Sequence, residues 1–224
     1  SAARSISWPV WSIGGNSGTA LSASAPHPAW FAEVVARGSV AFDTETTSLN
    51  EMTAELVGVS LALAPGRACY IPVGHVAGGG DDLFAEGAAR AEGQMPLEDL
   101  IAALKPMLED ASVMKIAQNT KYDVKVLARY GIDVAPIDDT MLMSYAQNGG
   151  LHGHGMDALS ERYLGHNPIP IKELVGSGKS QITFDKVEID KAAPYAAEDA
   201  DVTLRLAMLL KPGLHKSHVT TVYE

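Results

Sequence analysis

Two carboxylates separated by one residue follow a short apolar run in the first quarter of the chain. Asp43 and Glu45 come directly after Val40-Ala41-Phe42. Because side chains alternate between the two faces of a β-strand, Asp43 and Glu45 should share one face while Thr44 points to the other. Two carboxylates on one face repel each other unless a hard cation such as Mg²⁺ or Mn²⁺ offsets their charge. An isolated Asp-x-Glu pair is more often a solvated strand edge or turn, so a metal site requires further acids elsewhere.

The first further acid lies in Gln118-Asn119-Thr120-Lys121-Tyr122-Asp123, which follows a predicted buried strand and opens a helix. In that position Asn119 can cap the helix. Asp123 suits the positive end of the helix dipole. Taken alone, this segment is explained by helix structure.

The second acidic segment is Tyr195-Ala196-Ala197-Glu198-Asp199-Ala200-Asp201, inside the longest predicted helix. Tyr195 and Asp199 are four residues apart and therefore share one helical face. The small Ala196-Ala197 pair would let this helix approach the sheet closely. Three carboxylates within four residues are costly beside an apolar face, so either a cation offsets them or they form a solvated face. We assign Asp201 to the solvated face because it points away from Asp199.

Composition limits the class of protein. The chain has 224 residues, 46% of them hydrophobic, enough to bury one core in one domain with appended ends. A formal net charge of −10 argues against a duplex-DNA binder with a broad basic surface. It does not exclude a nuclease, because bound metal offsets the charge of clustered carboxylates. No apolar run is long enough to cross a bilayer, so we expect a soluble protein with no membrane partner. Cys69, the single cysteine, fits a cytoplasmic setting and is expected to be a small buried apolar residue.

The pattern of apolar residues predicts a mixed α/β fold. A helix over 29–37 closed by Gly38 precedes strands over 39–44, 55–63 and 68–73, and their short connections predict an antiparallel meander. In the second strand, Val57, Val59, Leu61 and Leu63 should share one face. The elements then alternate: helix 96–109, strand 113–117, helix 121–130, strand 136–138, helices 140–147 and 156–164, and a long helix 187–210. Pro194 is a candidate break in that helix, and Pro212-Gly213 should end it.

Three segments fall outside this pattern. Residues 1–28 are interpreted as a linker or N-terminal extension, in which Trp8 and Trp11 pack rather than stack on bases and a short strand near residues 10–13 is left open. Residues 74–94 are predicted to be a mobile loop. Residues 176–180 lack the glycine spacing of a phosphate-binding loop and are predicted to be an exposed loop.

The three acidic segments resemble the three exonuclease motifs of the DEDD superfamily, in the subgroup with tyrosine in the third motif. The matching stretches are 42–46, 119–123 and 195–199. Leu49, Gln118 and the stretches 138–142, 156–164 and 176–184 extend the likeness to the 3′–5′ proofreading exonuclease domain of bacterial DNA polymerase I. The resemblance covers about residues 29–212.

This resemblance implies an α/β fold with a ribonuclease H-like mixed five-stranded sheet, an antiparallel meander plus parallel strands, flanked by helices. It implies an exonuclease domain over 29–212, with residues 213–224 starting the connection to a polymerase domain. The implied activity is metal-dependent removal of 5′-mononucleotides from the 3′ end of single-stranded or frayed DNA. The implied partners are that DNA end and the polymerase domain, in the bacterial cytoplasm at the nucleoid.

The resemblance also implies a metal centre. Two divalent ions, Mg²⁺ or Mn²⁺, would be bound by Asp43, Glu45, Asp123 and Asp199. Asp43 would bridge the two ions, and Asp123 would orient the water shell of the second. Tyr195, together with Glu45, would position the attacking water.

The substrate-binding residues implied by the resemblance are Thr44, Leu49, Gln118 and Asn119. Leu49 would wedge against the terminal base, an apolar contact that tolerates any base. Gln118 and Asn119 would bind the sugar-phosphate of the last nucleotides.

Two alternatives stay open. A stand-alone 3′–5′ exoribonuclease resembling ribonuclease D shares the same three motifs and would be favoured by a C-terminal helical RNA-binding domain. A catalytically silent structural module of the polymerase would need no acids, and the presence of all four counts against it.

Overall fold

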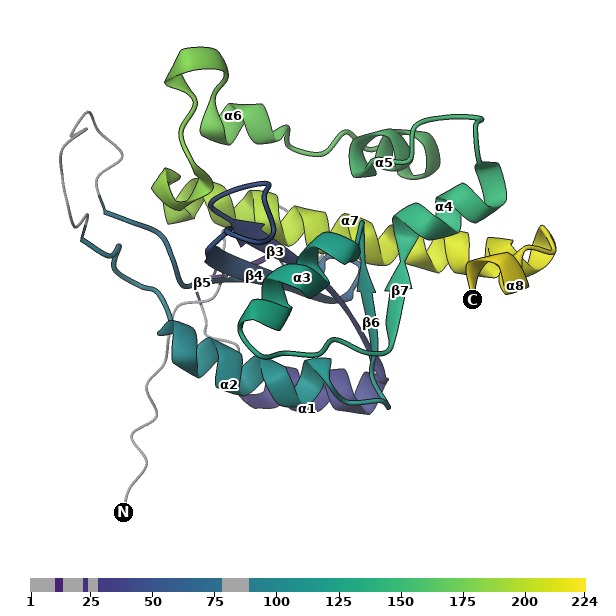
Figure 1. The fold of residues 1–224 in the computed structure, drawn as a ribbon, viewed down its shortest axis with the longest axis horizontal. Helices are drawn as coiled ribbons and strands as arrows, with labels where there is room; N and C mark the ends of the chain where they lie inside the picture. Colours follow the sequence, from purple (N-terminus) through teal and green to yellow (C-terminus); the bar gives the residue numbers. More distant parts are fainter. Residues whose placement is uncertain (1–10, 14–21, 24–27, 78–88) are drawn as a thin grey trace.

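The computed structural model describes residues 11–13, 22–23, 28–77 and 89–224. Its centre is one mixed sheet with the strand order β2-β1-β5-β4-β3-β6-β7 (Figure 1). The strands are β1 (Trp11–Ile13), β2 (Ser22–Ala23), β3 (Ser39–Thr46), β4 (Leu56–Ala64), β5 (Arg67–Pro72), β6 (Met114–Ala117) and β7 (Ile137–Asp139). β3, β4 and β5 are antiparallel, whereas β6 runs parallel to β3 and β7 parallel to β6. The predicted five-stranded sheet, β3 to β7, is confirmed, and β1 and β2 extend it beyond β5.

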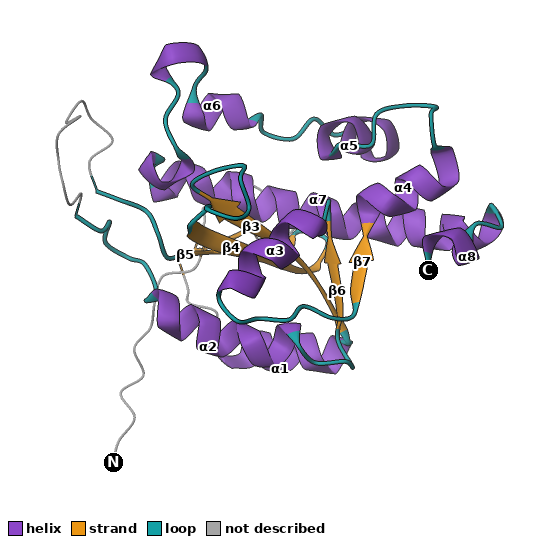
Figure 2. Ribbon diagram, viewed as in Figure 1, coloured by secondary structure: helices purple, strands orange, loops and turns teal. Residues whose placement is uncertain are grey.

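Helices cover both faces of this sheet (Figure 2). α1 (Pro28–Arg37), α2 (Leu97–Leu108) and α3 (Lys121–Arg129) enclose the larger core on one face. α7 (Ile189–Lys216) crosses the other face, and α4 (Thr140–Asn148), α5 (Met156–Leu164) and α6 (Ile171–Val175) pack against it. The remaining elements are η1 (Gly178–Ser180), η2 (Phe184–Lys186) and α8 (Thr220–Tyr223). Within the described residues, none of the helices combines the length and the apolar character that crossing a bilayer requires.

Small side chains determine how closely α7 approaches the sheet. Ala41, Ala62 and Ala68 form a row across β3, β4 and β5, since these residues are register partners. They pack with Ala197 and Ala200 of α7 in one buried cluster. The prediction that small residues let this helix approach the sheet closely is confirmed, and the approach brings the acids of α7 to the end of β3.

Neither proline interrupts α7, which corrects the candidate break at Pro194 and the predicted end at Pro212-Gly213. A proline inside a helix costs about 3 kcal/mol. Ala192 and Ala193 before Pro194, and Ala196 and Ala197 after Tyr195, are completely buried, so packing offsets this cost. Gly213 leaves room for Gln147 of α4, whose amide donates a 2.9 Å hydrogen bond to the Leu210 carbonyl. The division of the chain at residues 28 and 212 stays a prediction.

The predicted alternation along β4 fails at Val57. The other members of the predicted face, Val59, Leu61 and Leu63, lie in the larger core. Val57 instead packs with Tyr70 on the α7 face. The cause is a shift in the β3–β4 register between Glu45 and Thr46, an irregularity of the β-bulge type that reverses which side chains face each way.

The remaining predictions concern loops and the cysteine. Residues 78–88 of the predicted mobile loop lie outside the described residues, as does Trp8. The described ends of that loop are packed, because His75 and Gln94 are buried and the His75 amide donates a 2.6 Å hydrogen bond to the Gln94 side chain. Residues 176–180 are exposed as predicted. Cys69 is completely buried as predicted, and burial raises the pKa of its thiol to about 12.

Candidate active site

Three carboxylates converge where α7 crosses the end of β3. Asp43 and Glu45 extend from β3 toward α7, and Asp199 reaches them from α7. Each offers one oxygen, and these three oxygens lie within 4.8 Å of one another. The strand period of two and the close approach of α7 therefore bring together the acids of the first and third acidic segments.

The charges of this three-carboxylate group are poorly compensated. Burial, followed by the charge of Asp199, raises the pKa of Asp43 to about 8. Burial likewise raises the pKa of Asp199 to about 8, although the neighbouring Tyr195 hydroxyl acts in the opposite direction. The pKa of Glu45 is raised well above its ordinary value, first by burial and then by the charge of Asp43.

One oxygen of the three-carboxylate group lacks a hydrogen-bond partner, which bears on whether the group suits a cation. The Oε1 atom of Glu45 is buried and, among the described residues, has no hydrogen-bond partner. An unpaired buried acceptor carries a large desolvation cost, which a bound cation would remove. Hard oxygen donors of this kind are the ligands that Mg²⁺ and Mn²⁺ prefer. Asp43, Glu45 and Asp199 therefore fit a divalent ion.

Asp123 lies apart from the three-carboxylate group and faces Thr44. Its Oδ1 atom accepts hydrogen bonds from the Thr44 amide, at 3.1 Å, and from the Thr44 hydroxyl, at 2.5 Å. Thr44 thus points away from Asp43 and Glu45 as predicted, and it positions Asp123 of α3. Burial and then the charge of Asp43 raise the pKa of Asp123 well above its ordinary value, so its charge acts on the same site.

The loop before α3 differs from the sequence interpretation. Asn119 does not cap α3, because it adopts a left-handed backbone with φ of 59° and the helix is flanked by Thr120 instead. Asn119 is exposed, whereas Gln118 is buried, its amide donating a 2.9 Å hydrogen bond to the His154 carbonyl. The carboxylate that holds this loop is Asp139, which accepts from the amides of Asn119, at 3.2 Å, and Thr120, at 2.9 Å.

Asp139 is a residue that the sequence interpretation did not assign to any role. It also caps α4, accepting hydrogen bonds of 2.8 and 3.2 Å from the amides of Met141 and Leu142. The signal in the sequence was an aspartate directly before a predicted helix, which is typical of an N-cap. Its second set of contacts, to the loop before α3, depends on the pairing of β6 with β7 and leaves no local pattern.

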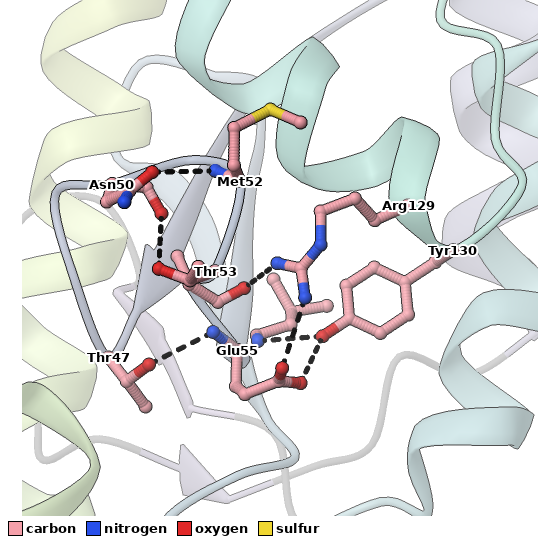
Figure 3. Close-up of polar contacts among 9 residues, drawn as sticks. Thr47, Asn50, Met52, Thr53, Glu55, Arg129 and Tyr130 are labelled. Carbon is pink, nitrogen blue, oxygen red and sulfur yellow. Dashed lines mark hydrogen bonds and ion pairs between the residues drawn. The ribbon is translucent and has the colours of Figure 1, made fainter.

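Leu49 stands on a firmly held loop. Its side chain is 94% exposed. Tyr122 of α3 donates a hydrogen bond to the Ser48 carbonyl, and its hydroxyl lies 2.5 Å from Oγ1 of Thr46. Figure 3 shows the far end of the loop, where Glu55 receives hydrogen bonds of 3.1 Å from both Arg129 and Tyr130.

Two further acids of α7, Glu198 and Asp201, have structural partners. Asp201 is partly exposed and accepts hydrogen bonds of 2.6 Å from the Gly66 amide and from Arg205. Glu198 accepts a 2.7 Å hydrogen bond from the Ile169 amide. Tyr195 is partly buried one helical turn before Asp199, and the centre of its ring lies 6.0 Å from that of Phe184.

The model of the 3′–5′ exonuclease family of DNA polymerase A matches residues 22–215 of this chain. The chain belongs to this exonuclease family. The exonuclease domain is 54% identical over 204 residues to DNA polymerase I of Rhizobium leguminosarum, a match covering 87% of this chain and 20% of that protein. It is 41% identical over 185 residues to DNA polymerase I of Pseudomonas aeruginosa, covering 81% and 19%. The chain thus spans about a fifth of the length of these relatives.

Solved structures resemble the exonuclease domain in fold. Brucella melitensis NrnC bound to pGG matches with a TM-score of 0.61 at 23% identity, covering 83% of this chain and 78% of that one. Escherichia coli RNase D, an exoribonuclease, matches with a TM-score of 0.61 at 18% identity, covering 88% and 44%. The predicted ribonuclease H-like fold is confirmed, and the identification as an exonuclease domain of the DNA polymerase I type rests on the family and its closer relatives.

Proposed function

We propose that this domain removes 5′-mononucleotides from the 3′ end of single-stranded or frayed DNA in a metal-dependent reaction. The observation that carries the proposal is the three-carboxylate group with its unpaired Glu45 oxygen. The family model describes a 3′–5′ exonuclease, and the three-carboxylate group is the place in this chain where that reaction would occur. Fraying selects mismatched ends, because a mispaired terminus costs less to unpair.

Asp43, Glu45 and Asp199 would hold one divalent ion, and Asp123 would orient the water shell of a second ion that Asp43 also contacts. When bound, such ions activate a water and stabilise the charge that develops on the oxygens of a phosphoryl displacement. The chain contributes the negative charge and the fixed geometry. α7 sets the position of Asp199, and the Thr44 hydrogen bonds set that of Asp123.

Tyr195 would position the attacking water together with Glu45. Its place one turn before Asp199 supports this role. Leu49 would wedge against the terminal base, and its almost complete exposure on a loop held at both ends supports that role. Gln118 and Asn119 would serve to bind the sugar-phosphate of the last nucleotides. Asn119 is exposed and would contact it directly, whereas the buried Gln118 would act by fixing the adjacent loop through its hydrogen bond to the His154 carbonyl.

We further propose that the domain acts within a longer polypeptide that includes a polymerase domain, because the chain matches about a fifth of the length of relatives named DNA polymerase I. The single-stranded 3′ end would then reach the site from the polymerase domain. The corresponding location is the cytoplasm, at the bacterial nucleoid.

The test is degradation of matched 5′-labelled DNA and RNA oligonucleotides with Mg²⁺ or Mn²⁺. We expect the DNA to shorten from its 3′ end and Asp43→Ala to abolish this. Shortened RNA beside intact DNA would instead favour an exoribonuclease such as RNase D, whose fold this domain shares. No shortening of either polymer would favour a structural module.

A further inference from the structure

A fully buried tyrosine stands beside the three-carboxylate group on the same face of the sheet. Tyr70 of β5 is register partner of Ser60, which is in turn the partner of Asp43. Its hydroxyl lies over Gly58, because a Cβ atom on that glycine would fall 2.2 Å from the hydroxyl oxygen. Gly58 is the direct partner of Glu45 across β3 and β4. Since cross-strand partners on one face are neighbours, the Tyr70 hydroxyl occupies the space next to Glu45.

The Tyr70 hydroxyl is directed toward a histidine. It lies 2.8 Å from Nε2 of His75, and Nδ1 of His75 lies 2.9 Å from the Val187 carbonyl. A carbonyl can only accept, so Nδ1 carries the proton and Nε2 is the acceptor. The hydroxyl proton therefore points to His75 and away from Glu45. Burial, the largest influence, lowers the pKa of His75, which agrees with a neutral ring.

The position of His75 is fixed on every side. Its main chain is paired with Gln94, which accepts from its amide at 2.6 Å and donates to its carbonyl at 2.7 Å. Its ring packs against Tyr70 and against Phe184, with centroid distances of 5.9 and 5.8 Å. His75 is 1% exposed and Tyr70 is completely buried, so bulk solvent does not reach this hydrogen bond.

We propose that His75 is a positioning residue that keeps the Tyr70 hydroxyl from donating to Glu45 and so leaves Oε1 of Glu45 available to a divalent cation. This inference rests on the metal site of the proposed function. Without the His75 acceptor, the buried hydroxyl must find another acceptor. The unpaired Oε1 of Glu45 offers one, because the hydroxyl lies over Gly58, the cross-strand partner of Glu45. A hydrogen bond there would compete directly with the cation.

Two amide variants separate this role from packing. In His75→Gln the amide can reach the place of Nε2 and accept from Tyr70. In His75→Asn it can reach only the place of Nδ1 and donate to the Val187 carbonyl. Both variants are polar, uncharged and similar in size, so they match each other in burial cost. The measurement is the Mn²⁺ dissociation constant by titration calorimetry, without DNA, on proteins whose folding is checked by circular dichroism.

We expect His75→Asn to weaken Mn²⁺ binding about tenfold, the effect of one competing hydrogen bond to a carboxylate, and His75→Gln to change it less than about twofold. Adding Tyr70→Phe to His75→Asn should restore binding, because the competing hydroxyl is gone. A purely structural role for His75 would give no such rescue. Equal binding by His75→Asn and the wild type would overturn the inference, as would a double variant that binds no better than His75→Asn.

A further variant keeps the inference testable if His75→Asn does not fold. Tyr70→Phe alone should bind Mn²⁺ as the wild type does, because the hydroxyl is not used by Glu45. A tenfold gain would show that the wild-type hydroxyl already donates to Glu45, and a tenfold loss would show that the hydroxyl supports cation binding. Either result would overturn the inference. A wild-type protein that binds no Mn²⁺ would instead contradict the proposed metal site itself.

Discussion

At the scale of single residues, burial and mutual repulsion make ionisation of the acids in the site unfavourable. The pKa of Asp43 and that of Asp199 are both raised to about 8. Between about pH 4 and pH 8 the folded protein therefore binds more protons than the unfolded chain does. Under that condition the free energy of unfolding falls as pH rises. The metal-free domain is thus most stable on the acidic side of this window, before these carboxyls ionise.

We expect the unfolding free energy of the metal-free domain to fall by about 2 kcal/mol or more between pH 5 and pH 8. Asp199→Asn should reduce this slope and stabilise the metal-free protein at pH 8. Urea denaturation at several pH values measures both effects. Asp190→Asn, an exposed change on the same helix, is the control. A wild-type stability that rises between pH 5 and pH 8 would contradict the expectation.

Asp139 should matter for stability although it carries no chemistry. Its carboxylate accepts from four backbone amides, on the loop before α3 and at the start of α4. Asp139→Ala should cost about 2–4 kcal/mol, because buried amides lose their acceptor. Asp139→Asn keeps one acceptor oxygen and should cost less. The exposed Asp133→Ala is the control in the same urea experiment, and equal costs for Asp139→Ala and Asp133→Ala would refute this role.

Spacing predicted the strand face shared by Asp43 and Glu45 and the close approach of α7, and the family resemblance implied that Asp199 joins them. Asp43 and Glu45 share a strand face by the period of two, and Asp199 lies on the helix face that the alanines bring to the sheet. The pairing of Thr44 with Asp123 was not predictable, because residues 79 positions apart meet only after the strands and helices have packed.

At the scale of elements, local rules gave the order of strands and helices but not their irregularities. Proline propensity predicted an interruption of α7, whereas burial of both helix faces outweighs it. The register shift beside Glu45 turns the Val57 side chain to the opposite face of the sheet, and the alternation of residues in β4 alone does not predict this. Both departures lie on the α7 face, where the site is built.

The loop between β3 and β4 is held at both ends by hydrogen bonds and exposes the side chain of Leu49. Leu49→Ala should lower kcat/KM on single-stranded DNA about tenfold, since stacking on a base contributes about 1–3 kcal/mol. The melting temperature should not change, because the side chain is 94% exposed. Met52→Ala is the matched control, as its side chain is 66% exposed on the same loop. Equal losses in the two variants would show that loop shape, not the Leu49 side chain, determines activity.

At the scale of the whole molecule, positive charge is scarce and partly neutralised. The chain has 17 Lys and Arg residues against 27 Asp and Glu. Two cations near the Leu49 loop are already paired, Lys125 with Glu51 at 2.7 Å and Arg129 with Glu55 at 3.1 Å. Such a surface offers few contacts to phosphates.

We therefore expect the isolated domain to bind single-stranded DNA with a shallow dependence on salt. Each phosphate contact contributes a slope of about −0.7 to a plot of log K against log salt for single strands. Contacts to no more than about two phosphates would give a slope no steeper than about −1.4. Fluorescence anisotropy with the cleavage-deficient Asp43→Ala variant measures it without degrading the DNA, and Lys125→Ala tests whether a paired lysine contributes. A slope several times steeper would mean that a basic surface binds the strand, contrary to the acidic charge balance of this domain.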